Sequence, residues 1–97
     1  MRLWIRLSDI LAYSVIFDKV FLKRLKKLKD SSPEIYSRLK AKIEEIVENP
    51  QHYKPLRNVL KGKRSAHIGS FVVIFSIDEA GKAVVFLEFA HHDEAYK

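Results

Sequence analysis

The sequence contains no cysteine, which excludes disulfide bonds, thiolate metal sites and a cysteine nucleophile. Glycine and proline occur only three times each, so the chain is neither a linker nor a low-complexity segment. No apolar run reaches the roughly 18 residues of a membrane-spanning helix. Because 47% of the 97 residues are hydrophobic, we expect one small globular domain, in a reducing cytoplasm and without a membrane partner.

Acidic residues are also missing from a long internal stretch. None occurs between Glu48 and Asp78, whereas five lysines or arginines and two histidines lie in that interval. The net charge of the whole chain is +6. Concentrated positive charge next to apolar segments is typical of domains that bind RNA, DNA or an acidic protein. The sequence therefore predicts a polyanionic partner.

The first half of the chain predicts a strand followed by two helices. Residues 12–17 form a short run of β-branched and aromatic residues, which is typical of a strand. Apolar residues then recur at helical spacing, first after Asp18 and again after Ser32 and Pro33. Asp18 and Ser32 are predicted N-caps, and Asn49-Pro50 is predicted to end the second helix. Residues 1–11 are expected to be an extension before the domain, which spans residues 12–97.

The second half predicts a sheet. Strands are expected at residues 65–68, 71–77 and 83–89, with a turn at 78–82. The run 71–77 is almost wholly apolar, which indicates a central strand buried on both faces. The order β-α-α-β-β-β predicts a two-layer α+β domain, in which a helical hairpin covers one face of a mainly antiparallel sheet. The other face would be left for function.

Several segments resemble one family. The run PLRNVLKGKRSAHIGSFVVIFSID, the strand VVFLEF and the ending HHDEAYK resemble the RelE/ParE superfamily of type II toxins, and the RelE/StbE-type mRNA interferases most of all. This resemblance implies a RelE-like fold and cleavage of mRNA on the ribosome, with no metal or other cofactor. It also implies a cognate antitoxin as a partner in a hetero-oligomer. A ParE-like gyrase poison and an inactive RNA- or antitoxin-binding module are the alternatives.

Cleavage of this kind needs three chemical functions. A base removes the 2′-OH proton of the RNA, cations stabilise the phosphorane, and an acid protonates the leaving 5′ oxygen. Histidine suits the proton transfers, and the planar guanidinium of arginine suits the phosphorane. The resemblance implies that these functions belong to Arg64, His67, His91, His92 and Tyr96. Because neighbours along a strand point to opposite faces, only one of His91 and His92 is expected to face the site.

The resemblance further implies that RNA-backbone contacts come from Lys54, Arg57, Lys61 and Lys63. Each candidate also has an ordinary structural interpretation. The four cations would then form a solvated loop, the histidines would be exposed or packed in the sheet, and Tyr96 would cover the core. His91 and Asp93 offer at most two metal ligands.

Two further features stay open in the sequence. The basic run on the first predicted helix is either a solvent-facing surface or a contact to ribosomal RNA. It consists of Lys23, Arg24, Lys26, Lys27 and Lys29. Glu88, a single acid in an apolar strand, would act as a base, orient an arginine or simply face the surface.

Overall fold

The computed structural model describes residues 13–95. The predicted extension at 1–11, the first residue of the predicted first strand (Ala12) and the candidate Tyr96 lie outside the described residues. The described elements are β1 (Ser14–Phe17), α1 (Lys19–Ser31), α2 (Pro33–Glu48), the short 3-10 turn η2 (Pro50–His52), β2 (Lys54–Pro55), a second such turn η3 (Asn58–Leu60), β3 (Lys63–Ile68), β4 (Phe71–Asp78), β5 (Ala83–His91) and α3 (His92–Ala95).

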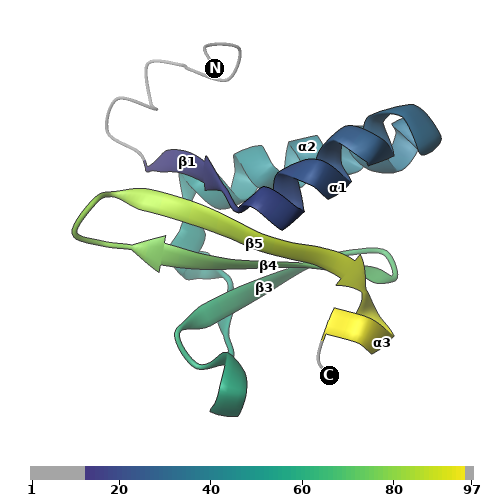
Figure 1. Ribbon diagram of the computed structural model, residues 1–97. Coiled ribbons are helices and arrows are strands. Elements are labelled where there is room, and N and C mark those ends of the chain that lie inside the picture. The colour runs from purple at the N-terminus through teal and green to yellow at the C-terminus, as the bar shows by residue number, and fades with distance from the viewer. Residues whose placement is uncertain (1–12, 96–97) are drawn as a thin grey trace.

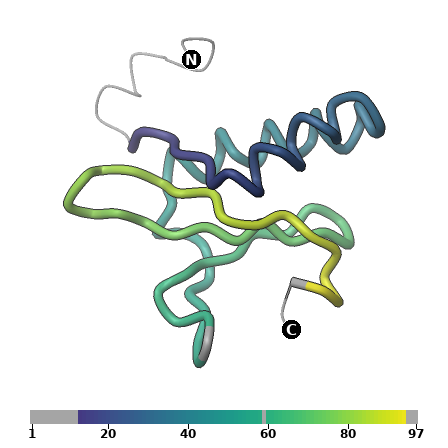
Figure 2. The backbone as a smooth tube through the Cα atoms, in the orientation of Figure 1, coloured from purple at the N-terminus to yellow at the C-terminus, as the bar shows by residue number. Residues whose placement is uncertain are grey.

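The strands form one five-stranded sheet in the order β1-β5-β4-β3-β2. β1 pairs in parallel with β5, and the other neighbours are antiparallel. Both long helices cover the same face of this sheet (Figure 1). Figure 2 shows how the chain leaves β1 for the helical hairpin and returns through β2 to the far edge. The predicted two-layer α+β architecture is confirmed.

Local sequence explains where the helices begin and end. The Asp18 carboxylate accepts a hydrogen bond of 3.0 Å from the amide of Val20 and so caps α1. Ser32 occupies the N-cap of α2 as predicted, but its side chain makes no capping hydrogen bond. Pro33 at the first helical position has no amide hydrogen to satisfy, which suits that place. The end of α2 at Glu48, just before Asn49-Pro50, agrees with the prediction.

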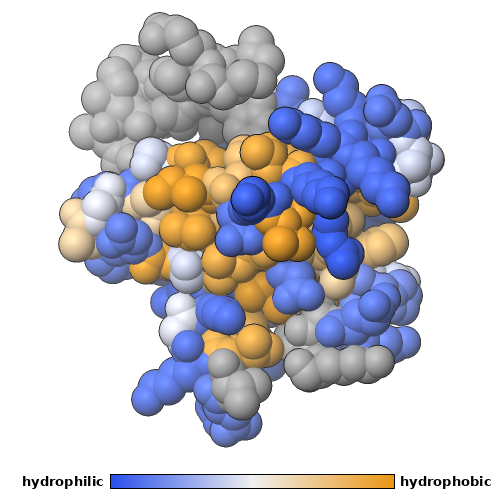
Figure 3. All heavy atoms as spheres, in the orientation of Figure 1, coloured by the Kyte–Doolittle hydropathy of each residue, from blue (hydrophilic) through white to orange (hydrophobic). Residues whose placement is uncertain are grey.

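The main core lies between the helices and the sheet. It combines buried side chains of α1 and α2 with those of three strands, and its fully buried members include Phe21, Leu39, Ile43, Phe75 and Phe86. Phe21 and Phe86 lie with ring centroids 5.6 Å apart. No helix within residues 13–95 is long and apolar enough to cross a membrane. Figure 3 shows hydrophilic side chains over the helical hairpin and an apolar area along the neighbouring sheet.

Tertiary contacts add elements that the sequence patterns do not predict. β3 begins two residues earlier than expected and β5 ends two residues later, at His91. β2 is only two residues long and exists because Lys54 and Pro55 pair with Ser65 and Arg64. α3 follows β5 directly and is a single turn. Such short elements carry no hydrophobic periodicity of their own, so their pairing partners define them.

Candidate active site on the open face of the sheet

We call the side of the sheet away from α1 and α2 the open face. Cross-strand partners point to the same side of a sheet, so the pairing assigns its members. On β3 and β4 these are Lys63, Ser65, His67, Val72, Ile74 and Ser76; on the flanking strands they are Lys54, Val85, Glu88 and Ala90. The face has its own small apolar cluster of Val72, Ile74 and Ala90, against which Leu56 packs. It therefore carries an apolar floor with polar groups around it.

Two candidate histidines meet on this face. The rings of His67 on β3 and His92 in α3 are stacked, with centroids 6.0 Å apart and planes inclined by 27°. The His92 amide donates a 2.8 Å hydrogen bond to the carbonyl of Ser70, which ties the start of α3 to the β3–β4 turn. Both imidazoles are exposed. The arrangement places two imidazoles, each able to accept or donate a proton, next to each other.

His91 lies on the opposite side. Its ring contacts Phe71 edge-on, with centroids 5.8 Å apart, and Phe71 stacks on Phe89 of the main core. The carboxylate of Asp93 lies 3.8 Å from the Nδ1 atom of His91 and also 3.8 Å from Nδ1 of His92. The two rings nevertheless contact different neighbours, Phe71 and His67, because His91 is the last residue of β5 and His92 already belongs to α3.

The predicted RNA-binding lysines and arginine surround the same face. Lys54 pairs with Ser65 and Lys63 with Ser76, so the side chains of both lysines leave the backbone on the open face. Arg57 and Lys61 are exposed on the loop between β2 and β3. Leu56 anchors this loop through its packing, and its amide donates a 2.8 Å hydrogen bond to the Lys63 carbonyl. The loop between β2 and β3 and the helix α3 therefore both lie on the side of the sheet away from α1 and α2 (Figure 1).

Arg64 is placed differently. Arg64 pairs with Phe75, a residue of the main core, so its side chain leaves the backbone on the helix side of the sheet. Its Nη1 atom donates to the carbonyls of Tyr53, at 2.7 Å, and Gln51, at 3.2 Å. The structure does not bring Arg64 to the side of His67. Its role at the scissile phosphate stays a prediction, and its contacts favour a role in holding η2 and β2 on β3.

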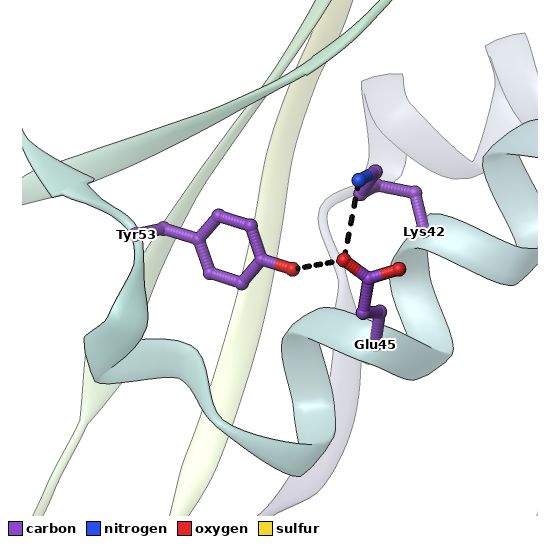
Figure 4. A network of polar contacts seen from close by, with 3 residues as sticks. All are labelled: Lys42, Glu45 and Tyr53. Carbon is purple, nitrogen blue, oxygen red and sulfur yellow. Dashed lines mark hydrogen bonds and ion pairs between the residues drawn. The ribbon is translucent and has the colours of Figure 1, made fainter.

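Tyr53 joins the same segment to α2 (Figure 4). Its hydroxyl donates a 2.9 Å hydrogen bond to Glu45 of α2, which also accepts from Lys42 at 3.3 Å. Burial, followed by this hydrogen bond, raises the pKa of Tyr53 to about 12. The same hydrogen bond, with Lys42 second, lowers the pKa of Glu45. Tyr53 and Arg64 together position Lys54, a function that no local sequence pattern indicated.

Two sets of candidates remain, the basic run of α1 and Glu88. Arg24 of the α1 basic run donates from Nη1 to the Phe89 carbonyl at 3.1 Å, while Lys23, Lys26, Lys27 and Lys29 are exposed on the helical layer. The side chain of Glu88 lies on the open face. Among residues 13–95, no three histidine or acidic side chains are grouped as a metal site.

Comparison with known proteins gives the class of this molecule. The arrangement of a strand, a helical hairpin and a mainly antiparallel sheet is that of the RelE-type toxins, whose solved structures superpose on it. A family model described as the ParE toxin of the type II toxin-antitoxin system parDE matches residues 15–96. The chain belongs to this family, and it is a type II toxin of the RelE/ParE superfamily.

Individual relatives agree with this assignment. A protein from Methanocaldococcus jannaschii that carries the toxin name RelE4 is 43% identical over 76 residues, which cover 77% of this chain and 81% of that protein. The toxin-antitoxin complex RelBE2 from Mycobacterium tuberculosis contains a chain that is 30% identical, with a TM-score of 0.68 and coverage of 82% and 98%. The isolated RelE toxin from E. coli is 21% identical, with a TM-score of 0.69 and coverage of 88% and 92%, and shows the same fold.

Proposed function

We propose that this toxin is an endoribonuclease that cleaves mRNA by attack of the RNA's own 2′-OH on the adjacent phosphate. One imidazole of the His67–His92 pair, in its neutral form, takes the 2′ proton. The other, as imidazolium, protonates the 5′ oxygen as the P–O bond breaks. The products are a 2′,3′-cyclic phosphate and a 5′-OH end. No cofactor takes part in these steps.

The stacking of His67 on His92, at 6.0 Å on the open face, is the observation that carries this proposal. An acid and a base that serve one phosphodiester must both lie within hydrogen-bond reach of its oxygens. The nitrogens of an imidazole point outward in the plane of the ring, so two rings stacked at this separation can direct their edges to oxygens of one phosphate group. Both are exposed, so an RNA strand can approach them without a rearrangement of the core.

Lys54 is the cation that the proposal places at the scissile phosphate. It pairs with Ser65, two residues before His67 on β3. With roughly 4.8 Å between strands and 3.3 Å per residue, the Cα atoms of Lys54 and His67 lie about 8 Å apart. The long lysine side chain bridges that gap. Arg57, Lys61 and Lys63 bind the flanking phosphates, and Tyr96 is expected to stack on a base.

Two solved complexes support an antitoxin as a partner. The RelE-type toxins of M. tuberculosis and E. coli have been solved as toxin-antitoxin complexes. We expect this chain to form a hetero-oligomer with a cognate antitoxin in the cytoplasm, through an acidic segment that covers the basic open face. When that antitoxin is not bound, mRNA in the ribosome is the proposed substrate.

The test is cleavage of mRNA in programmed ribosomes under single-turnover conditions, with mapping and chemical analysis of the new ends. His67→Gln and His92→Gln should each lower the rate at least 100-fold while ribosome binding is kept. His91→Gln is the matched control, since that ring lies on the other side of the sheet, and should be nearly fully active. Equal activity of all three variants, or products with 5′-phosphate ends, would refute the proposed mechanism.

The ParE name of the family model favours one alternative, inhibition of DNA gyrase without RNA cleavage. Such a function needs binding only, so it gives no reason for two exposed histidines to stack on the open face. A gyrase supercoiling assay run beside the cleavage assay separates the two. Gyrase inhibition that survives His67→Gln and His92→Gln, with intact mRNA throughout, would establish the alternative.

A further inference from the structure

β5 contains an irregularity that controls where Glu88 points. Residues Asp78 to Phe75 of β4 pair in turn with Ala83 to Phe86 of β5. The next pair is Ile74 with Glu88, so the register skips Leu87, which is an additional residue in β5. Without this bulge, Phe86 and Glu88 would share one side of the sheet. With it, Phe86 and Phe89 both enter the main core, at 0% and 5% exposure, while Glu88 faces the open face. Bulges often redirect a side chain near a functional site.

The position of Glu88 on the open face is defined by the register. Its partner Ile74 pairs with Ser65, and Ser65 pairs with Lys54. Glu88 is therefore three strands from Lys54, about 14 Å away, which is too far for an ion pair. Its flanking side chains are the buried Ile74 and Ala90, which offer no hydrogen-bond donor. Within residues 13–95 no hydrogen bond or ion pair reaches its carboxylate.

Water still reaches the Glu88 carboxylate, since within residues 13–95 no buried side-chain oxygen lacks a partner. RNA bound to the open face would displace this water, so the ligand must supply hydrogen-bond donors in its place. Phosphate groups repel the carboxylate, so the donors must come from another part of the ligand. In single-stranded RNA the unstacked bases present N–H groups on their Watson–Crick edges. Guanine offers two parallel donors, N1–H and N2–H, which match the two oxygens of a carboxylate. Adenine and cytosine offer only an amino group, and uracil a single ring N–H.

Distance separates this role from proton transfer. His67 lies two strands and two residues away from Glu88 by the register, which places their Cα atoms about 12 Å apart. Side chains of a strand stand roughly perpendicular to the sheet, so the carboxylate and the imidazole stay about that far apart. Groups that serve one phosphodiester must each reach its oxygens at roughly 3 Å. Glu88 therefore meets a nucleotide beside the one that is cleaved.

We infer that Glu88 is a specificity-determining residue that reads a guanine next to the cleaved bond by bidentate hydrogen bonds from N1–H and N2–H. This inference rests on the proposed RNA cleavage. It gives the β5 bulge two consequences, since one additional residue completes the aromatic core and also places a base-reading carboxylate on the open face.

The first experiment compares cleavage-site sequences in pooled mRNA for the wild type and Glu88→Gln. The glutamine has nearly the same shape, but it replaces one acceptor oxygen with a donor. We expect the wild type to favour guanine at one fixed position, and Glu88→Gln to lose that preference about 10-fold or more with a total rate within a few-fold of the wild type. Glu44→Gln, on the helical layer, removes the same charge and should leave the preference unchanged.

The second experiment does not depend on cleavage. A short 2′-O-methylated oligouridine that carries one guanosine is titrated into the wild type and into Glu88→Gln, next to oligouridine alone, with binding followed by fluorescence anisotropy. The guanosine should strengthen binding to the wild type about 10-fold and have little effect on the variant. This readout also supports the inference if the wild type proves unable to cleave RNA, in which case only the proposed function fails.

Three results would overturn the inference. Glu88→Gln that keeps the guanine preference and the guanosine-dependent binding shows that another residue reads the base. Glu88→Gln that abolishes cleavage of all sequences equally makes Glu88 part of the catalytic chemistry. Weakened binding of the cognate antitoxin, with no change toward RNA, makes it an antitoxin contact instead.

Discussion

Replacement of Arg64 with alanine removes the cross-link between β3 and the segment that leads into β2. A hydrogen bond from a charged donor contributes roughly 1.5–3 kcal/mol, and exposed ones contribute less. The 2.7 Å contact with the half-buried Tyr53 carbonyl should contribute about 2 kcal/mol, and the longer, exposed contact with Gln51 about 0.5 kcal/mol. We expect Arg64→Ala to lower the free energy of unfolding by about 2–3 kcal/mol.

The assay is urea-induced unfolding followed by circular dichroism. The dependence of the unfolding free energy on urea concentration, the m-value, should be the same for the variant and the wild type. Lys63→Ala is the matched control. Lys63 is the neighbouring basic residue of β3, but it starts from the open face, and its loss should change the stability by less than about 0.5 kcal/mol. After correction for the folded fraction, Arg64→Ala should weaken RNA binding and cleavage together, because Lys54 is no longer held in place.

A different outcome would refute this reasoning. If Arg64→Ala were as stable as the wild type and lost roughly 100- to 1000-fold in cleavage rate with RNA binding kept, the guanidinium would act on the phosphorane. That is the role that the family resemblance implies. The two interpretations differ in the change in unfolding free energy and in whether RNA binding is kept, so a single variant decides between them.

Three further predictions concern the same region. Tyr53→Phe removes a hydrogen bond that lowers the pKa of Glu45, so this pKa should rise in an NMR titration. The lowered pKa stabilises the fold above pH 4.5, and this stabilisation is lost as the pH falls through the pKa of the folded state. The variant should therefore lose less stability on acidification than the wild type. Leu56→Ala should cost about 1–2 kcal/mol in urea unfolding, because Leu56 is half-buried on the open-face cluster; unchanged stability would mean that the loop is not anchored there. Lys54→Ala should reduce the slope of log K against log salt concentration for RNA by about 0.7 to 1, whereas the exposed Lys29→Ala on α1 should leave it unchanged.

The sequence by itself determined the two layers of this domain. Apolar residues at helical spacing specify α1 and α2, the Asp18 cap and Pro50 set two of their ends, and the apolar run from Phe71 identifies the central strand. These signals are local, since each depends on residues within one helix or one strand. The basic loop is likewise evident from the sequence, because it falls within the stretch that contains no acidic residue.

Only the tertiary structure decided which candidates share a face. His67 and His92 are far apart in the sequence, and they meet because β3 and β4 form a hairpin and β5 ends at His91. Arg64 lies an odd number of residues from His67 along β3, so it starts from the other side of the sheet. The bulge at Leu87 redirects Glu88, and it arises because Phe86 and Phe89 both gain by burial in one core. Strand register depends on contacts between distant segments, so no local pattern contains it.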